Sequence, residues 1–355
     1  MRTVLSFENE ELSCLSNTRM LEKVRQSCPD DLVILVSAGD FSSGGSLLTP
    51  FCEERAKAYV KAGADLVLSL PVASILGGYG KKEFAGAALA QNLHAPDFRI
   101  VIPCVPTAGQ TLKDCEKKLR SFAMLMFQER SGYRSTLTKH LTEMPLREAQ
   151  TQTVCECFPE AAEFLFCPEN RQALWLLDAM LQLYYMPKTQ FIAVEKGEAF
   201  VEDRGHTIPF ENNAAAKAAA FLESCSPEQL IDISGSTTQM ASSLLEKKAD
   251  VLSAGSLERI TDLLKPAPAD RSRLFLLKMI LGIRKIQMQI CGLHTYVPYC
   301  HVCAGNPDRQ DQLKQLEEIS WIPFIGGQLK AQKAKEDYSY LLEADRKAGE
   351  LTTAQ

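Results

Sequence analysis

The fold is decided by residues 32–41, Leu-Val-Ile-Leu-Val-Ser-Ala-Gly-Asp-Phe, together with residues 63–71, Gly-Ala-Asp-Leu-Val-Leu-Ser-Leu-Pro. Each stretch contains a short, nearly continuous apolar run, which is typical of a parallel strand buried on both faces. A helical pattern over Pro50–Ala62 separates the runs, so the sequence predicts a strand, a loop, a helix and a second strand. Because such crossovers are right-handed, the turn that begins at Gly39 would lie at the carboxyl end of the sheet, where α/β proteins bind ligands. The alternative is that its glycines only make a flexible turn.

Short apolar runs and helical patterns continue to alternate on both sides of this unit. The pattern between residues 227 and 289 is almost wholly helical, and residues 349–355 are expected to fray. An alanine-rich helix is predicted at residues 211–222, with Asn212 or Asn213 as its cap. Further strands are predicted at residues 2–7, 99–102, 190–194, 296–303 and 322–325, and further helices at 18–26, 82–92, 112–130, 143–154, 168–183 and 310–319.

These patterns predict an α/β fold, with a Rossmann-like parallel sheet joined to a mainly helical C-terminal domain. A chain of 355 residues with 46% hydrophobic content is long enough for two domains. We place the first domain at residues 1–224, with a helical insertion at about 112–165. The second domain is expected at residues 225–355, with a small α/β lobe made by the last strands.

Composition favours some classes of function over others. The net charge of −5 gives no general attraction to nucleic acid, so RNA binding would need a local basic patch, and we expect no DNA partner. No stretch reaches the roughly 18 apolar residues of a membrane span, so we expect a cytoplasmic protein without a membrane partner. The twelve cysteines are irregularly spaced, which favours free thiols, most of them in the core, over a disulfide framework.

Short motifs along nearly the whole chain follow the order and spacing of one known family. With them the chain resembles the bacterial tRNA(Met) cytidine acetate ligase family, a group within the nucleotidyltransferase-like α/β class. The resemblance implies a nucleotidyltransferase-type sheet, activation of acetate with ATP, and transfer of the acetyl group to the wobble cytidine of elongator tRNA-Met. The motifs are Ala38-Gly39-Asp40-Phe41, Arg55, residues 61–71, Pro168-x-Asn170, Pro298-Tyr299-x-x-Val302 and Pro323-Phe324-Ile325.

The first nucleotide motif of that family is altered in this chain. In the family, ATP rests on a His-x-Gly-His loop whose imidazoles donate hydrogen bonds to phosphate oxygens. Cys14-Leu15-Ser16-Asn17 stands in its place. A thiol is a weak donor and an amide a neutral one, and Ser16 adds a side chain where the purine would rest. Cys14 could act as a nucleophile at a helix N-terminus, but no histidine is near it in sequence, so a small buried or half-buried thiol is the preferred interpretation.

Other nucleotide-contacting positions have changed as well. The family's Ala-Ser-Ala-Thr-Ser-Ile-Arg segment falls on residues 211–217, where only the last positive charge remains, as Lys217. Ile102 stands where the family has a glycine, and Glu195, which would repel a polyphosphate, stands near the position of an arginine. These changes predict a divergent pseudoenzyme that lacks ATP-dependent acetate activation and binds tRNA or a protein partner.

An active enzyme is the alternative hypothesis. Such a ligase or nucleotidyltransferase would need ATP and magnesium at a site rebuilt around Asp40, Asn170 and Lys217. Gly39 and Ile102 complete this set of nucleotide-pocket candidates. ATP binding at millimolar nucleotide would distinguish the two hypotheses.

A basic segment offers a candidate surface for RNA. Its charges share a helix with an apolar stripe, so they are expected largely on the exposed side. Contact with RNA phosphates is one interpretation, and an ordinary solvated helix face is the other. The segment contains Lys265, Arg271, Arg273, Lys278, Arg284 and Lys285, of which Lys265, Arg271, Arg273 and Arg284 are the RNA-binding candidates.

Cys300-His301-Val302-Cys303 has the two-residue gap of a zinc-chelating turn. No second Cys or His pair has a matching spacing, and the segment is predicted as a strand. We therefore predict no metal site.

Overall fold

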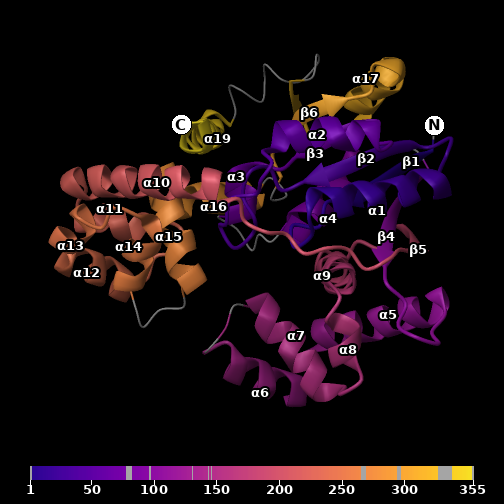
Figure 1. Ribbon diagram of the computed structural model, residues 1–355, viewed down its shortest axis with the longest axis horizontal. Coiled ribbons are helices and arrows are strands. Elements are labelled where there is room, and N and C mark those ends of the chain that lie inside the picture. Colours follow the sequence, from indigo (N-terminus) through magenta and orange to yellow (C-terminus); the bar gives the residue numbers. More distant parts are fainter. Residues whose placement is uncertain are drawn as a thin grey trace.

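The protein is described here by a computed structural model that covers residues 2–76, 82–95, 97–129, 131–142, 144, 146–264, 269–293, 297–326 and 338–353. Its centre is a seven-stranded sheet in the order β5-β4-β1-β2-β3-β6-β7 (Figure 1). The strands β1 to β5 pair in parallel, which confirms the predicted α/β fold with a parallel sheet. The strands are β1 Thr3–Phe7, β2 Leu32–Ser37, β3 Leu66–Ser69, β4 Phe98–Cys104, β5 Lys188–Ala193, β6 Cys300–Gly305 and β7 Phe324–Ile325.

The last two strands differ from the sequence-based expectation. β6 pairs antiparallel with β3, and β7 pairs with β6, so both extend the main sheet and do not form a separate small lobe. A short apolar run carries no information about its partner strand, which is why that expectation was wrong. Val302 lies opposite Leu68 and Ala304 opposite Val67, so Cys303 has no partner and forms a bulge. The division of the chain into domains at residue 224 stays a prediction.

Alternate side chains of the strands face two layers of helices. Val33 of β2 belongs to a core shared with α1 and α2 on one face of the sheet. Its neighbour Ile34 belongs to the larger core, which includes α4 and α9 on the other face. The helices next to the sheet are α1 Cys14–Ser27, α2 Cys52–Lys61, α3 Val72–Leu76, α4 Lys82–Leu93 and α9 Pro168–Gln182.

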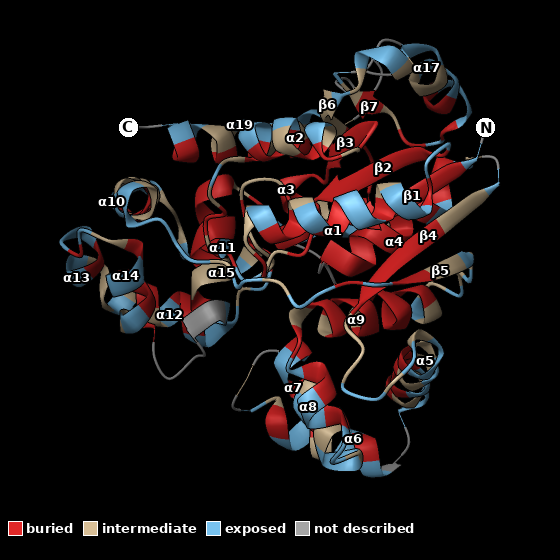
Figure 2. Ribbon diagram, turned by 45° about the vertical axis from the view of Figure 1, so that its right-hand side comes forward, coloured by how far each residue is buried: buried red, intermediate tan, exposed pale blue. Residues whose placement is uncertain are grey.

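Most remaining helices form two groups away from the sheet. The helices α5 to α8 gather beyond α9, and α10 to α15 form a second group, with α19 between that group and the sheet (Figure 1). Both groups bury their inner faces and expose their outer faces (Figure 2). No helix of the described residues is both long and apolar enough to span a membrane. The bounds are α5 Leu112–Gln128, α6 Ser131–His140, α7 Leu146–Cys157, α8 Ala161–Leu165, α10 Arg204–Ser224, α11 Pro227–Asp232, α12 Thr238–Glu246, α13 Lys248–Leu252, α14 Leu257–Leu263, α15 Ala269–Leu281, α16 Lys285–Leu293, η1 Pro307–Arg309, α17 Gln310–Ile319 and α19 Ser339–Thr353.

Three helix boundaries correct the sequence analysis. α1 begins four residues earlier than predicted, because the Ser13 side chain caps it by accepting a hydrogen bond from the Ser16 amide. α10 begins at Arg204 and is capped by Asp203, not by Asn212 or Asn213, and the internal proline at position 209 concealed this start. α19 remains helical through Thr353, so the expected fraying from residue 349 is wrong over most of that range.

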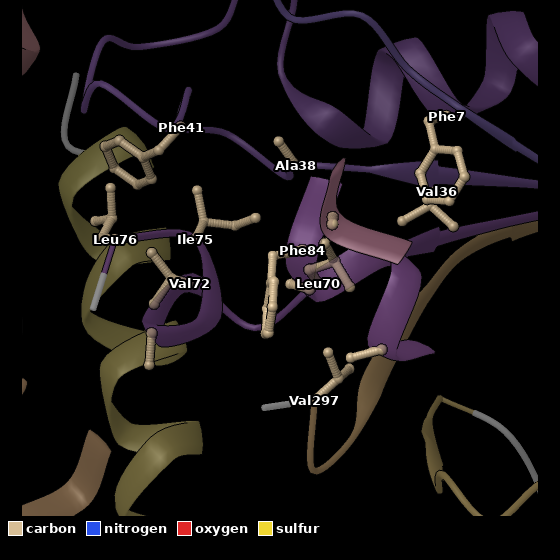
Figure 3. Close-up of a cluster of buried hydrophobic side chains, with 14 of the residues drawn as sticks. Phe7, Val36, Ala38, Phe41, Leu70, Val72, Ile75, Leu76, Phe84 and Val297 are labelled. Atoms are coloured by element: carbon tan, nitrogen blue, oxygen red, sulfur yellow. The ribbon is translucent and has the colours of Figure 1, made fainter. Parts of the chain in front are cut away.

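A dense apolar layer supports the carboxyl ends of β1, β2 and β3. Figure 3 shows Phe7, Val36 and Leu70 at these strand ends, together with Phe84 of α4 and residues of α3. Each of these four side chains is at most 8% exposed. This layer is the rigid base of the surface on which a ligand of an α/β sheet would rest.

The tight approach of α4 to β1 gives the first testable prediction. A Cβ atom added at Gly86 of α4 would lie 2.3 Å from Cε1 of Phe7, whose ring is buried. Gly86→Ala should therefore lower the free energy of unfolding by about 1–3 kcal/mol, measured by urea denaturation. Gly132→Ala in α6, where a Cβ meets no atom within 4 Å, is the matched control and should be neutral or stabilising. Equal stability of the Gly86 variant and the parent would contradict the packing described here.

Candidate functional site

A buried ion pair lies at the carboxyl end of β1. Nε of Arg55, in α2, is 2.7 Å from Oε1 of Glu8, and both side chains are at most 4% exposed. The Tyr59 hydroxyl donates to the same oxygen at 2.6 Å, and the Ser37 hydroxyl donates to the other. Burial alone would raise the pKa of Glu8, but the Arg55 charge and these hydrogen bonds lower it overall. Glu8 is therefore held as a carboxylate.

The same guanidinium fixes the loop after β2. Arg55 donates through Nη2 to the Gly39 carbonyl at 2.5 Å and through Nη1 to the carbonyls of Leu48 and Pro50. Gly39 has φ of +80°, a conformation that glycine adopts readily. The turn predicted to face a ligand is thus a rigid structure and not a flexible connection.

A cavity of about 460 Å³ opens beside this turn. It lies between the ends of β2 and β3, the first turn of α2, the strand β6 and the helix α19. Gly39 and Asp40 line it, as the sequence analysis proposed for a pocket, whereas Ile102, Asn170 and Lys217 do not. Its polar and sulfur-bearing lining residues are Asp40, Cys52, Glu53, Ser69, His301, Cys303 and Asp345.

Asp40 and His301 give the cavity its titratable character. Oδ1 of Asp40 accepts the Cys52 amide at 2.7 Å, yet burial raises the pKa of Asp40 overall. Nε2 of His301 lies 2.7 Å from Oδ2 of Asp345. Burial opposes protonation of the imidazole, but the Asp345 carboxylate outweighs it and raises the pKa of His301. Sequence reasoning missed Asp345, because α19 itself was not predicted.

Two thiols meet in the same cavity. Sγ of Cys52, the first residue of α2, lies 3.5 Å from Sγ of Cys303 at the β6 bulge. Cys300 belongs to the core and does not line the cavity, so the two cysteines of the Cys-His-Val-Cys motif point to different environments. Alternation along a strand separates residues three apart in this way. The sequence analysis considered this motif only as a zinc-chelating turn, and no sequence signal identified Cys52 as a neighbour of Cys303.

The altered first motif occupies the first turn of α1. The Asn17 side chain donates to the carbonyls of Asn9 and Ser13 and accepts the Asn9 amide at 2.8 Å. Asn17 is 3% exposed, so its amide closes the loop after β1 and does not face solvent. Cys14 is half-buried, and burial raises the pKa of its thiol, which agrees with the preferred interpretation of an unreactive cysteine.

A segment after β5 crosses directly over this turn. The Ser13 amide donates to the Glu198 carbonyl at 2.9 Å, and the Phe200 amide donates to the Glu11 carbonyl at 2.8 Å. The Ser16 hydroxyl accepts the Glu198 amide at 2.8 Å. We call residues 197–200 the crossing segment. A Cβ at Gly197 would lie 2.9 Å from Cβ of Ser16, so the segment rests on the helix at van der Waals contact.

Three amides at the start of α1 are bonded within the chain. The amides of Ser13, Ser16 and Asn17 donate to protein oxygens. A neighbouring cavity of about 220 Å³ has both carboxylates and cations in its lining. Its charged lining residues are Arg19, Glu22, Lys23, Glu169, Glu195 and Lys196.

The remaining nucleotide candidates have structural partners. The Asn170 amide exchanges hydrogen bonds of 2.9 and 3.0 Å with the Val105 backbone, which joins α9 to the end of β4. Ile102 lies inside β4, is 1% exposed and pairs with Phe191 of β5. Nζ of Lys217 lies 3.6 Å from the Glu350 carboxylate.

The basic segment is only partly exposed. Arg271 is exposed, and Arg284 is exposed with a weak contact of 3.9 Å to Asp232. Arg273 instead donates to the Gly45 carbonyl at 2.9 Å and pairs with Glu211 at 2.6 Å. Lys278 is 9% exposed, and burial lowers its pKa to about 8. The expectation that these charges face solvent was therefore wrong for Arg273 and Lys278, because both lie against neighbouring elements, and Lys265 lies outside the described residues.

The buried ion pair gives a prediction with a defined pH dependence. Because the pKa of Glu8 is lowered by folding, its contribution to stability is complete above the unfolded pKa of about 4.3 and is lost as the pH falls through the folded value. Glu8→Gln leaves Arg55 unpaired and should cost about 3–5 kcal/mol at pH 7. The loss relative to the parent should shrink below pH 4, measured by urea denaturation at each pH.

A second carboxylate on α2 provides the control for that measurement. Glu53 pairs with Lys57 at 2.8 Å, but both side chains are largely exposed. Glu53→Gln should change stability far less at every pH, because solvent screens an exposed pair. Similar losses for the Glu8 and Glu53 variants would refute the central role of the buried pair.

Comparison with known proteins adds the fold relationship. No protein-family model matches the sequence, and the search of curated proteins finds no match. Thermotoga maritima TmcAL bound with alpha-thio ATP is similar in structure, with a TM-score of 0.71 and 13% identity, over 98% of this chain and 92% of that chain. The apo form of the same protein gives a TM-score of 0.70 and 14% identity over the same shares. The chain therefore has the nucleotidyltransferase-like fold of TmcAL, a tRNA(Met) cytidine acetate ligase, as its motifs predicted.

Proposed function

We propose that this chain is a divergent relative of the tRNA(Met) cytidine acetate ligases that no longer activates acetate with ATP and acts by binding. Its proposed ligand is tRNA. The observation that carries the proposal is the crossing segment, which pairs with the loop before α1 and bonds the Ser13 amide and the Ser16 hydroxyl. The crystal structure of Thermotoga maritima TmcAL is bound with alpha-thio ATP, and these contacts of the crossing segment lead us to expect no such binding in this chain.

Electrostatics at the site supports the loss of catalysis. A hydrogen-bond donor aimed at the charge that develops in a transition state commonly stabilises that state by about 3 kcal/mol. This corresponds to a hundredfold or more in rate. Cys14 and Asn17 stand at the positions of the two histidines of the family's first motif. The Asn17 side chain already forms hydrogen bonds with the Asn9 backbone. Glu211, the first residue of the second motif, is bonded to Arg273 and to the Glu258 amide.

The alternative of a rebuilt ATP site has less support. Of its three proposed residues, only Asp40 lines the large cavity. The Asn170 amide is occupied by backbone groups, and Lys217 pairs with α19. These separate placements favour binding over catalysis.

The proposal predicts that the protein does not release pyrophosphate from ATP, acetate and magnesium. An active acetate ligase serves as the positive control for the assay. Replacing Cys14 and Asn17 with His and Ser16 with Gly should not restore activity, because the crossing segment and the second motif remain. Robust turnover by the natural chain would overturn the proposal. Turnover by the triple variant alone would show that the first motif is the only barrier.

A separate prediction concerns tRNA. Arg271 and Arg284 are the exposed candidates, so the double variant Arg271→Glu, Arg284→Glu should weaken tRNA binding and reduce the salt slope by about one for each lost phosphate contact. Fluorescence anisotropy with labelled elongator tRNA-Met at several salt concentrations measures both quantities. Lys57→Glu, on the exposed face of α2, is the control and should have little effect. Equal affinities of the double variant and the parent would refute this surface, and no tRNA binding at low salt would refute tRNA as the ligand.

A further inference from the structure

The thiols of Cys52 and Cys303 are close to each other and reachable from solvent. They come from segments far apart in the sequence, their sulfur atoms are 3.5 Å apart, and both line the cavity of about 460 Å³. Two features of the fold create the contact. Cys52 begins α2, and the bulge in β6 leaves Cys303 without a strand partner.

The surroundings of the pair favour one thiolate over two thiols. The hydrogen bond with Cys52 lowers the pKa of Cys303 to about 7, although burial opposes this shift. The same contact and burial raise the pKa of Cys52 well above its usual value. Contacts with Ser69 and His301 also favour the Cys303 thiolate, and Asp40 opposes it. Arg55 favours a thiolate at Cys52, whereas Asp40 opposes it. Asp345 holds His301, and Glu53 is a further carboxylate in the cavity lining.

We propose that Cys303 and Cys52 form a reactive dithiol that exchanges with small disulfides entering the cavity. The Cys303 thiolate attacks one sulfur of the small disulfide, forms a mixed disulfide and releases one thiolate. Cys52 then gives its proton to that released thiolate, attacks Sγ of Cys303 and expels the second thiolate. In total, two protein thiols are oxidised to one disulfide, and the small disulfide is reduced to two thiols.

The geometry needs only a short movement for the second step. A disulfide bond is about 2.0 Å long, so sulfurs that are 3.5 Å apart must approach by roughly 1.5 Å. Cys303 sits at an unpaired bulge position, where backbone constraints are weaker than inside a regular strand, so it can supply this movement while Cys52 stays fixed at the start of α2. The attacking thiol has a pKa close to neutral pH, which is the favourable range for exchange.

The chain contains two natural controls. Cys104 and Cys115 interact with each other, but both are fully buried. Cys157 is an exposed thiol on α7 with no such partner among the described residues. The buried pair tests whether two neighbouring thiols form a disulfide without access to solvent. Cys157 tests whether a solvent-exposed thiol without a neighbouring thiol goes beyond a mixed disulfide.

The experiment treats the folded full-length protein with hydroxyethyl disulfide at neutral pH, alkylates the remaining thiols and identifies them by peptide mass spectrometry. We expect a disulfide between the Cys52 and Cys303 peptides, a mixed disulfide at Cys157, and free thiols at Cys104 and Cys115. Cys52→Ala should stop the reaction at a mixed disulfide on Cys303. Cys303→Ser should leave Cys52 unreacted.

The rate of alkylation of Cys303 as a function of pH provides a second readout. It should rise with a midpoint near pH 7 in the parent, and the midpoint should move upward in Cys52→Ala, which cannot donate a hydrogen bond. Cys52→Ser, which can donate one, should retain part of the shift. Modification of Cys157 with Cys52 and Cys303 both still free would overturn the proposal. So would a stable mixed disulfide on Cys303 in the parent, or equal disulfide formation by the Cys104 and Cys115 pair. If circular dichroism shows that a variant is not folded, the measurements on the parent protein alone decide whether the proposal holds.

Discussion

The buried ion pair between Glu8 and Arg55 is the constraint on which the carboxyl edge of the sheet depends. Removing two charges from water is costly, and the cost is recovered only where geometry and hydrogen bonds are nearly complete. Here the carboxylate accepts from Arg55, Ser37 and Tyr59, and the guanidinium also reaches three backbone carbonyls. Lysine could not make this pattern, because it lacks the planar fork of donors. The pair therefore fixes the ends of β1 and β2, the Gly39 turn and the start of α2 relative to one another.

This constraint accounts for the sequence motifs that remain. Gly39, Asp40 and Arg55 belong to the structure of the turn, so each has a structural role that does not depend on a bound nucleotide. The first turn of α1 carries the altered first motif. Ser16 and Asn17 have structural roles there, because they hold the crossing segment and the loop before α1. The proposed loss of catalysis would therefore leave the framework of the fold in place.

Much of the fold could be predicted from the sequence, because the apolar runs of β2 and β3 and the helical periods between strands reflect burial directly. Contacts between distant segments could not. The antiparallel direction of β6 depends on the side from which the chain returns to the sheet. The contact between Cys52 and Cys303 joins segments 251 residues apart. Arg273 illustrates a different limit. Its sequence neighbours indicate an exposed basic helix, but its guanidinium satisfies Gly45 and Glu211 in other elements. Periodicity identifies the apolar face of a helix, but it does not identify the elements that pack against the polar residues of that helix.

The helix α19, which the sequence analysis did not predict, connects the cavity to the helical region. Its Asp345 accepts the Val72 amide and the Tyr299 hydroxyl and holds His301 at the cavity wall. One to two turns further on, Glu350 faces Lys217, and the Leu351 carbonyl accepts from Asn213, both in α10. The same helix therefore lines the cavity with Asp345, Ala348 and Gly349 and contacts α10 with Glu350 and Leu351. A change in the charge of His301 would act directly on Asp345, because Nε2 of His301 lies 2.7 Å from Oδ2 of that carboxylate. The cavity wall and the packing of α10 thus depend on the position of one helix.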